Sequence, residues 1–175
     1  MKKIGLILLL GVMCFNLTGC QSSEEEVPVD NEKQTNYVEE ETVEILVAKF
    51  NTEVVDNTEL FPASNDYLTV SDNAYWYGLM SGFYLAVVPV EFTNDASNEI
   101  VDYMILQVDK GGEYENNATE YLKYLIKANN EELTEEEIED LISNSKENEN
   151  IIKGIEVDYV ENDDVSEYRV IKLYK

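Results

Sequence analysis

The sequence predicts an α+β fold in which an antiparallel sheet carries helices packed on one face. Three observations lead to this prediction. Apolar residues recur with a helical period between Thr42 and Asn57, and again between residues 118 and 142. The segments 67–109 and 155–174 are instead short apolar or alternating runs separated by turn residues. Each half of the chain therefore runs helix first and strands second, a grouping typical of α+β proteins.

The first helix is expected to begin near Thr42 and to end near Asp56 and Asn57. Its apolar face repeats at steps of three and four residues: Val43, Leu46, Val47, Phe50 and Val54. This spacing is the pattern of an amphipathic helix packed on a core. Pro62 and the polar residues 64–66 then break the chain.

Strands are expected next, at residues 67–70, 74–80, 83–91 and 100–109. Ser81 and Gly82 separate the second strand from the third and predict a hairpin, because glycine readily adopts a positive φ. Pro89 has no N–H to give to a neighbouring strand, so we expect it at a sheet edge or at a bulge. The polar residues 94–98 form a loop, and Gly111 and Gly112 close the last of these strands.

Two further helices are expected in the second half. The first follows Asn116 and Asn117, either of which could cap it, and carries an apolar stripe: Tyr121, Leu122, Leu125 and Ile126. The second begins with Thr134 to Glu137, a capping box in which the threonine side chain accepts from a backbone N–H and the last glutamate reaches back. Leu133 and Ile138 are placed to form the accompanying hydrophobic staple.

The last two strands are expected at residues 155–159 and 168–174, joined by a turn at 162–164. In the first of them Ile155, Val157 and Tyr159 alternate with acids, so one face should be buried and the other wet. Arg169, the only arginine of the chain, is expected to pair with an acid across this hairpin.

A second set of signals lies at the start of the chain. Lys2 and Lys3 precede an apolar run from Ile4 to Phe15, the pattern of a secretory signal peptide. The run is shorter than the roughly 20 apolar residues that a transmembrane helix needs. It ends in Leu17-Thr18-Gly19-Cys20, which resembles the lipobox of bacterial lipoproteins.

The resemblance covers only the first 20 residues and concerns anchoring alone. It implies that residues 1–19 are a cleaved lipoprotein signal peptide and that the Cys20 sulfur carries a diacylglyceryl group. The mature protein would then be held by this lipid at the outer face of the cell membrane. Because Cys14 is removed and Cys20 is consumed, no disulfide could form in the mature chain. The Asn-, Lys-, Glu-, Ile- and Tyr-rich composition, taken with the lipobox, favours a low-GC Gram-positive bacterium.

The remainder divides into a tether and a domain. Residues 20–41 are expected to form a disordered acidic tether, because residues 21–41 hold eight acids and one lysine without periodicity. A flexible coil of about 20 residues spans roughly 25 Å, enough to clear the lipid headgroups. Residues 42–175 are then expected to form a single α+β domain.

The charge of the chain restricts its partners. There are 37 acidic and 12 basic residues and no histidine, a net charge of −25, which becomes −27 if Lys2 and Lys3 are cleaved off. Such a surface repels phosphate backbones, so nucleic acid is not expected as a partner. It favours a basic partner or a cation, or it serves only solubility in cation-rich surroundings.

The sequence lacks the residues that most catalytic mechanisms use. Without histidine or a free cysteine, Ser–His and Cys–His nucleophiles and zinc sites with imidazole or thiolate ligands are excluded, so we expect no catalytic residues and no metal ligands. Calcium, which takes oxygen ligands, is the one cofactor weakly favoured. The acidic loops at 72–73 and 162–164 lack the spacing of a calcium loop, however, and turn formation explains them.

The aromatic residues of the predicted hairpin are the most informative feature of the domain. Tyr75, Trp76 and Tyr77 are consecutive, and Tyr84 follows across the turn, so both faces of the strand present large rings. Such rings are usually core residues, but an exposed row can stack on sugars or hold a partner. We therefore select these tyrosines and the tryptophan as candidate ligand-binding residues.

Together these observations predict a lipid-anchored extracytoplasmic surface protein, a non-enzymatic module that binds a protein or a cell-wall ligand. Two alternatives stay open. The first is a small carboxylate-dependent hydrolase acting on cell-wall glycan, which would need two acids across a pocket, one with a raised pKa. The second is an accessory subunit of a membrane complex, in which the anchor only raises local concentration.

Overall fold

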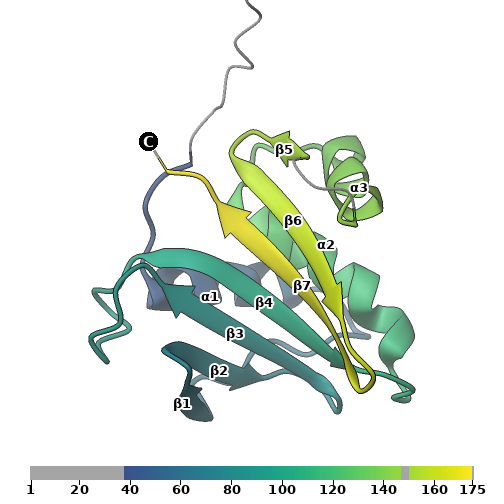
Figure 1. The fold of residues 1–175 in the computed structure, drawn as a ribbon, viewed down its shortest axis with the longest axis horizontal. Coiled ribbons are helices and arrows are strands. Elements are labelled where there is room, and N and C mark those ends of the chain that lie inside the picture. Colours follow the sequence, from purple (N-terminus) through teal and green to yellow (C-terminus); the bar gives the residue numbers. More distant parts are fainter. Residues whose placement is uncertain (1–37, 147–149, 175) are drawn as a thin grey trace, which may run out of the picture. The chain divides into compact units, whose positions relative to one another are not determined.

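The computed structural model describes residues 38–146 and 150–174 (Figure 1). The predicted signal peptide at 1–19, the lipobox with Cys20 and the tether up to residue 37 lie outside the described residues. Residues 38–41, the predicted end of the tether, belong to the fold. The Val38 N–H donates to the Leu173 carbonyl at 3.3 Å, and the Glu41 carbonyl accepts from Val101 at 3.0 Å.

The strands of the described part form a seven-stranded antiparallel sheet in the order β1-β2-β3-β4-β7-β6-β5 (Figure 1). Their bounds are β1 Thr69–Ser71, β2 Ala74–Gly78, β3 Phe83–Pro89, β4 Val101–Asp109, β5 Ile151–Ile152, β6 Ile155–Glu161 and β7 Val165–Lys172. The β2–β3 hairpin turns at Gly82, which has a φ of +80°. The strand register shifts between Val88 and Pro89, so the proline lies at a bulge as predicted.

Helices α1 (Val43–Val54), α2 (Ala118–Asn129) and α3 (Glu135–Ser143) begin close to where the sequence predicts. The Thr42 side chain caps α1, accepting from the Ile45 N–H at 3.4 Å. The capping box of α3 is confirmed, with both hydrogen bonds between Thr134 and Glu137 present. Asn117 precedes α2 without a side-chain capping bond, because a short 3-10 helix, η1 (Glu115–Asn117), leads directly into α2.

The helices cover one face of the sheet, and the predicted α+β class is confirmed. In Figure 1, α1 and α2 lie behind the strands, and α2 contacts β4 and β7 while α3 contacts β5 and β6. Alternate residues of the strands point towards the helices and form the core with them: Tyr75, Tyr77, Leu85, Val87, Met104, Leu106, Val157 and Val170. All of these side chains are at most 4% exposed.

Candidate functional site

The face of the sheet turned away from the helices is the first candidate site. Because successive strand residues point to opposite faces, strand register places Trp76, Ala86, Ile105, Arg169 and Asp158 in one row across it. Flanking rows contain Val88, Tyr103, Ile171 and Glu156 on one side and Tyr84, Gln107, Glu167 and Val160 on the other. We call these three rows the open face.

The open face is unusually apolar for a solvent-facing side of an antiparallel sheet, which is normally polar. Over β2, β3 and β4 it presents Trp76, Tyr103 and Ile105, all half-buried, and Tyr84, which is 36% exposed. The Trp76 indole N–H donates to the Ser71 carbonyl at 3.3 Å, which fixes the orientation of the ring. A rigid aromatic group on an accessible surface is typical of a binding site.

The other half of the open face is acidic. Glu156, Asp158 and Glu167 project from β6 and β7. Arg169 pairs with Glu167 on its own strand, with 3.4 Å between Nη2 and Oε2, rather than with an acid across the hairpin as the sequence analysis expected. Residues two apart on a strand share a face, so this pair forms without crossing to a neighbour. The open face thus joins an apolar half to a half with net negative charge.

The four predicted ligand-binding residues fall on different faces. Trp76 and Tyr84 lie on the open face as diagonal neighbours of the β2–β3 pair. Tyr75 and Tyr77 point to the helices and are 0% and 4% exposed, so they are part of the core. Burial raises the pKa of Tyr77 to about 12, which keeps its hydroxyl protonated at neutral pH.

The sequence analysis missed Tyr103, Ile105 and Ile171 as members of this surface. A signal was present in β4, where Tyr103 and Ile105 alternate with Met104, Leu106 and Val108, so both faces of one strand are apolar. An antiparallel strand with two apolar faces needs cover on both. Helices α1 to α3 cover only one of the two faces.

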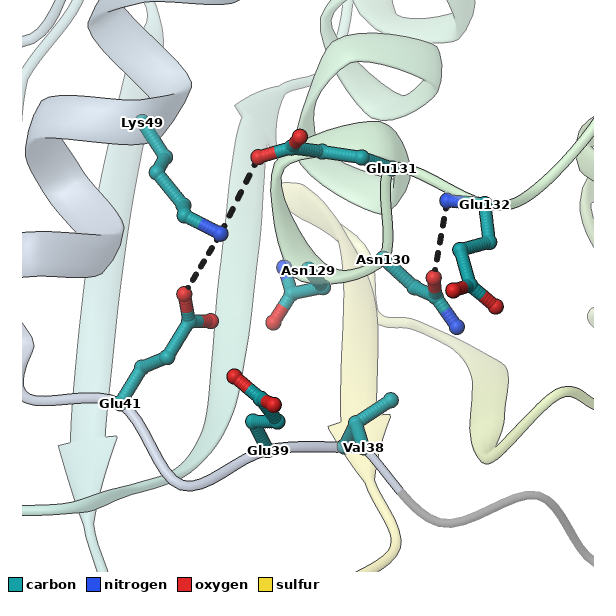
Figure 2. A pocket seen from close by; sticks show the side chains of 8 residues that line it. All are labelled: Val38, Glu39, Glu41, Lys49, Asn129, Asn130, Glu131 and Glu132. Carbon is teal, nitrogen blue, oxygen red and sulfur yellow. Dashed lines mark hydrogen bonds and ion pairs between the residues drawn. The ribbon is translucent and has the colours of Figure 1, made fainter.

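A second candidate lies on the helix side of the molecule (Figure 2). It is a pocket of about 410 Å³ between the start of the domain, α1 and the end of α2, lined by Val38, Glu39, Glu41, Lys49, Asn129, Asn130, Glu131 and Glu132. The Lys49 Nζ lies 2.7 Å from Glu41 Oε1 and 3.1 Å from Glu131 Oε1. Behind this group, Lys172 Nζ contacts Glu41 Oε2 at 2.6 Å with its side chain fully buried.

The ion pairs of this pocket fix the charge of Glu41. Burial disfavours its ionised form, but hydrogen bonds to Lys172 and Lys49 outweigh burial, and the pKa of Glu41 is lowered. Burial also lowers the pKa of Lys172. Glu41 is therefore a carboxylate at neutral pH, held between two ammonium groups.

The other acids whose pKa is clearly shifted show the same tendency. Across residues 38–146 and 150–174, each carboxyl with a clearly shifted pKa has a lowered one: Glu41, Asp95, Glu99, Glu137 and Glu161. A glycosidase acid needs the opposite shift. Within these residues no three potential metal ligands cluster, and no helix is both long and apolar enough to cross a membrane.

Comparisons of the chain with models of protein families, with curated proteins and with solved structures found no match.

Proposed function

We propose that this chain is a lipid-anchored binding protein that works outside the cell, and that the open face of the sheet holds a protein partner. The observation that carries the proposal is the accessible apolar surface around Trp76, Tyr84, Tyr103 and Ile105. Aromatic side chains of this kind supply much of the binding energy in protein interfaces, and they lose little conformational entropy when they are already held in place.

The charge of the open face defines the chemistry of the partner. Its acidic half, on β6 and β7, adjoins the apolar half on β2 to β4, and the whole chain carries a net charge of −25. A complementary partner presents an apolar patch bordered by lysine or arginine. Opposite charges then accelerate encounter, whereas the apolar contact sets the lifetime of the complex.

A binding role is favoured over hydrolysis by the state of the carboxyl groups. Glycoside hydrolysis by paired acids requires one protonated carboxyl at working pH. The most buried acid of the part that the structure describes, Glu99, is 4% exposed and has a lowered pKa, and Glu41 in the pocket also has a lowered pKa. Neither is suited to donate a proton to a leaving group.

The anchor is the second part of the proposal and rests on the sequence. Lys2, Lys3, the apolar run to Phe15 and the motif ending in Cys20 together support export and acylation. Two acyl chains give stable membrane attachment where a single chain does not. We expect Cys20→Ala to release the protein from the membrane fraction into the medium of its natural host, measured by fractionation. Equal distribution of both forms would contradict the lipid anchor.

The binding surface is tested by site-specific photocrosslinking on intact cells. A photoreactive phenylalanine analogue at Tyr84 or Tyr103 should give one discrete protein adduct. The same analogue at Ile45, a 51% exposed apolar residue of α1 on the helix side, should not give it. Adding Ile105→Glu should abolish the adduct, because a charge in the apolar half opposes desolvation.

The identified partner then permits a second measurement with purified proteins. Binding to the unmodified chain should weaken with rising salt, since charge complementarity contributes. Trp76→Ala should weaken binding about tenfold or more, while Ile45→Ala should leave it unchanged. If position 45 gives the same adduct as positions 84 and 103, or if Ile105→Glu leaves that adduct intact, the open face is not the binding surface.

A further inference from the structure

The side chain of Asn129 lies at the last residue of α2 and is only 4% exposed. Its Nδ2 donates to the Leu125 carbonyl at 2.7 Å and contacts the Met104 sulfur at 3.4 Å. Turning the amide over would set its oxygen against the Leu125 carbonyl oxygen, so the hydrogen bonds define which atom is the acceptor.

The Asn129 Oδ1 atom has no hydrogen-bond partner within residues 38–146 and 150–174. Figure 2 shows it turned to the side of the pocket where Glu39 and Glu41 lie. Buried acceptors in proteins are normally satisfied, because an acceptor removed from water without a donor is costly. Because Asn129 lines the pocket, this buried acceptor lies at the pocket wall, where a ligand N–H or O–H group that displaces the atoms covering it can satisfy it.

The surroundings of this oxygen select a positively charged donor. The pocket is lined by the carboxylates of Glu39, Glu41, Glu131 and Glu132, against one lining lysine, Lys49. That lysine is already held by Glu41 and Glu131. The four carboxylates outnumber Lys49 and the buried Lys172 behind Glu41, so the net charge around the pocket is negative, and a charged donor makes a stronger hydrogen bond than a neutral one.

The size and spacing of the pocket distinguish between cations. A volume of about 410 Å³ suits a small organic group. A metal ion needs several oxygens at about 2.0–2.6 Å from one point, and no three acids gather in this way within the part of the chain that the structure describes. An ammonium group instead donates hydrogen bonds of about 2.7–2.9 Å in three directions, which suits separated acceptors.

We infer that this pocket binds a primary ammonium group, with Asn129 Oδ1 and the Glu39 carboxylate as its acceptors. The group belongs either to a small free amine or to a lysine side chain of a protein. This site lies on the helix side of the sheet and is separate from the open face. The proposal of this site is therefore independent of the protein partner proposed for the open face.

The test is an NMR titration of the full-length ¹⁵N-labelled chain in detergent micelles. The probes are cadaverine, a lysine flanked by neutral N-acetyl and N-methylamide caps, and 1-pentanol as a neutral analogue of similar length. We expect saturable shifts of the Asn129 side-chain amide and of the Glu39 and Lys49 backbone amides with at least one amine, and none with pentanol. Binding of cadaverine indicates a free amine as the natural ligand, and binding of only the capped lysine indicates a protein side chain.

Two variants and a control tie the signal to the pocket. Asn129→Ala removes the acceptor and should abolish the saturable shifts at Glu39 and Lys49. Glu39→Gln removes one exposed charge without touching the core and should weaken binding about five- to tenfold. Glu113→Gln, an exposed acid outside the pocket, should leave the affinity unchanged.

The inference is overturned by any of four results. Shifts that do not saturate, or equal shifts with pentanol, show nonspecific contact. Equal affinity for Glu39→Gln and the unmodified chain shows that the pocket charge is not used, and this holds even if Asn129→Ala does not fold. The absence of saturable shifts with both amines also overturns the inference, and a parallel titration with calcium chloride that does give saturable shifts then shows a metal site instead.

Discussion

At the scale of single residues, Glu99 is the one buried acid among residues 38–146 and 150–174. It lies in the loop before β4, is 4% exposed and accepts hydrogen bonds from the Thr93 backbone, from the Thr93 hydroxyl at 2.9 Å and from the Asp95 backbone at 3.3 Å. Burial opposes its ionisation, but the neighbouring Tyr75 hydroxyl and these donors outweigh burial and lower the pKa of Glu99. The carboxylate therefore organises the loop that carries the chain from β3 into β4.

Replacing Glu99 by glutamine is expected to destabilise the protein. The amide keeps the shape, and its oxygen can replace Oε1, which accepts all three of these hydrogen bonds, but the negative charge that strengthens them is lost. We expect a loss of about 1–3 kcal/mol in the free energy of unfolding, measured by urea denaturation at pH 7. Glu113→Gln, an exposed acid, should change it by less than about 0.5 kcal/mol. Equal stabilities of the two variants would contradict this role of Glu99.

The same residue predicts a pH effect with a definite sign. Because the pKa of Glu99 is lowered on folding, the unfolded chain binds more protons than the folded chain between the folded pKa and the ordinary value near 4.5. The stability that Glu99 contributes is thus present above pH 4.5 and is lost as the pH falls through its folded pKa. The difference in unfolding free energy between the unmodified chain and Glu99→Gln should therefore shrink from pH 6 to pH 3. A constant difference would contradict the lowered pKa.

At the scale of elements, the sequence predicts those features that depend on neighbours along the chain. The α3 capping box, the hairpin turn at Gly82 and the bulge at Pro89 all follow from local rules of backbone geometry. It does not predict β5, a two-residue strand that pairs with β6 and contacts α3. So short a segment has no periodicity of its own, and its conformation is determined by its tertiary contacts with other elements.

Loss of the α3 cap gives a prediction at this scale. Thr134→Ala removes the side-chain acceptor for the Glu137 N–H, while the helix keeps its buried residues Ile138 and Leu141. We expect a loss of about 1 kcal/mol in unfolding free energy, the usual contribution of an N-terminal cap. Thr58→Ala, at an exposed loop position, is the matched control and should be neutral. A neutral Thr134→Ala would show that α3 is held by its packing alone.

At the scale of the whole molecule, one face of the sheet forms the core with the helices and the opposite face is the first candidate site. Alternation along β2 predicts that Tyr75 and Trp76 point in opposite directions, but not which of them meets the helices. The positions of α1 and α2 determine which of them faces the core, and these helices precede and follow the first four strands in the sequence. The pocket behind the sheet is likewise non-local, since Lys172 meets Glu41 across 131 positions of sequence. The pocket is therefore not visible in any short window of the chain, whereas the open face is visible in part, through Trp76 and Tyr84.

The charge of the whole molecule also determines how its stability responds to salt. With 37 acids and 12 bases, the folded chain repels itself at pH 7, and folding brings these charges closer together. Its exposed ion pairs, such as Lys49 with Glu131, contribute only about 0–1 kcal/mol each to stability. When salt screens all charges, the stability lost from these pairs is therefore smaller than the stability gained from weaker repulsion. Added salt should therefore stabilise the fold.

We expect the melting temperature at pH 7 to rise by about 3–6 °C between about 0.02 and 0.5 M NaCl, which corresponds to roughly 1–2 kcal/mol for a chain of this size. The rise should shrink at acidic pH, where protonation of carboxylates reduces the net negative charge and with it the repulsion. Scanning calorimetry with NaCl and with KCl separates screening, which is equal for both salts, from specific binding of one cation, which is not. A melting temperature that falls with salt at pH 7 would show that attraction between the ion pairs, and not net repulsion, dominates the electrostatics of this fold.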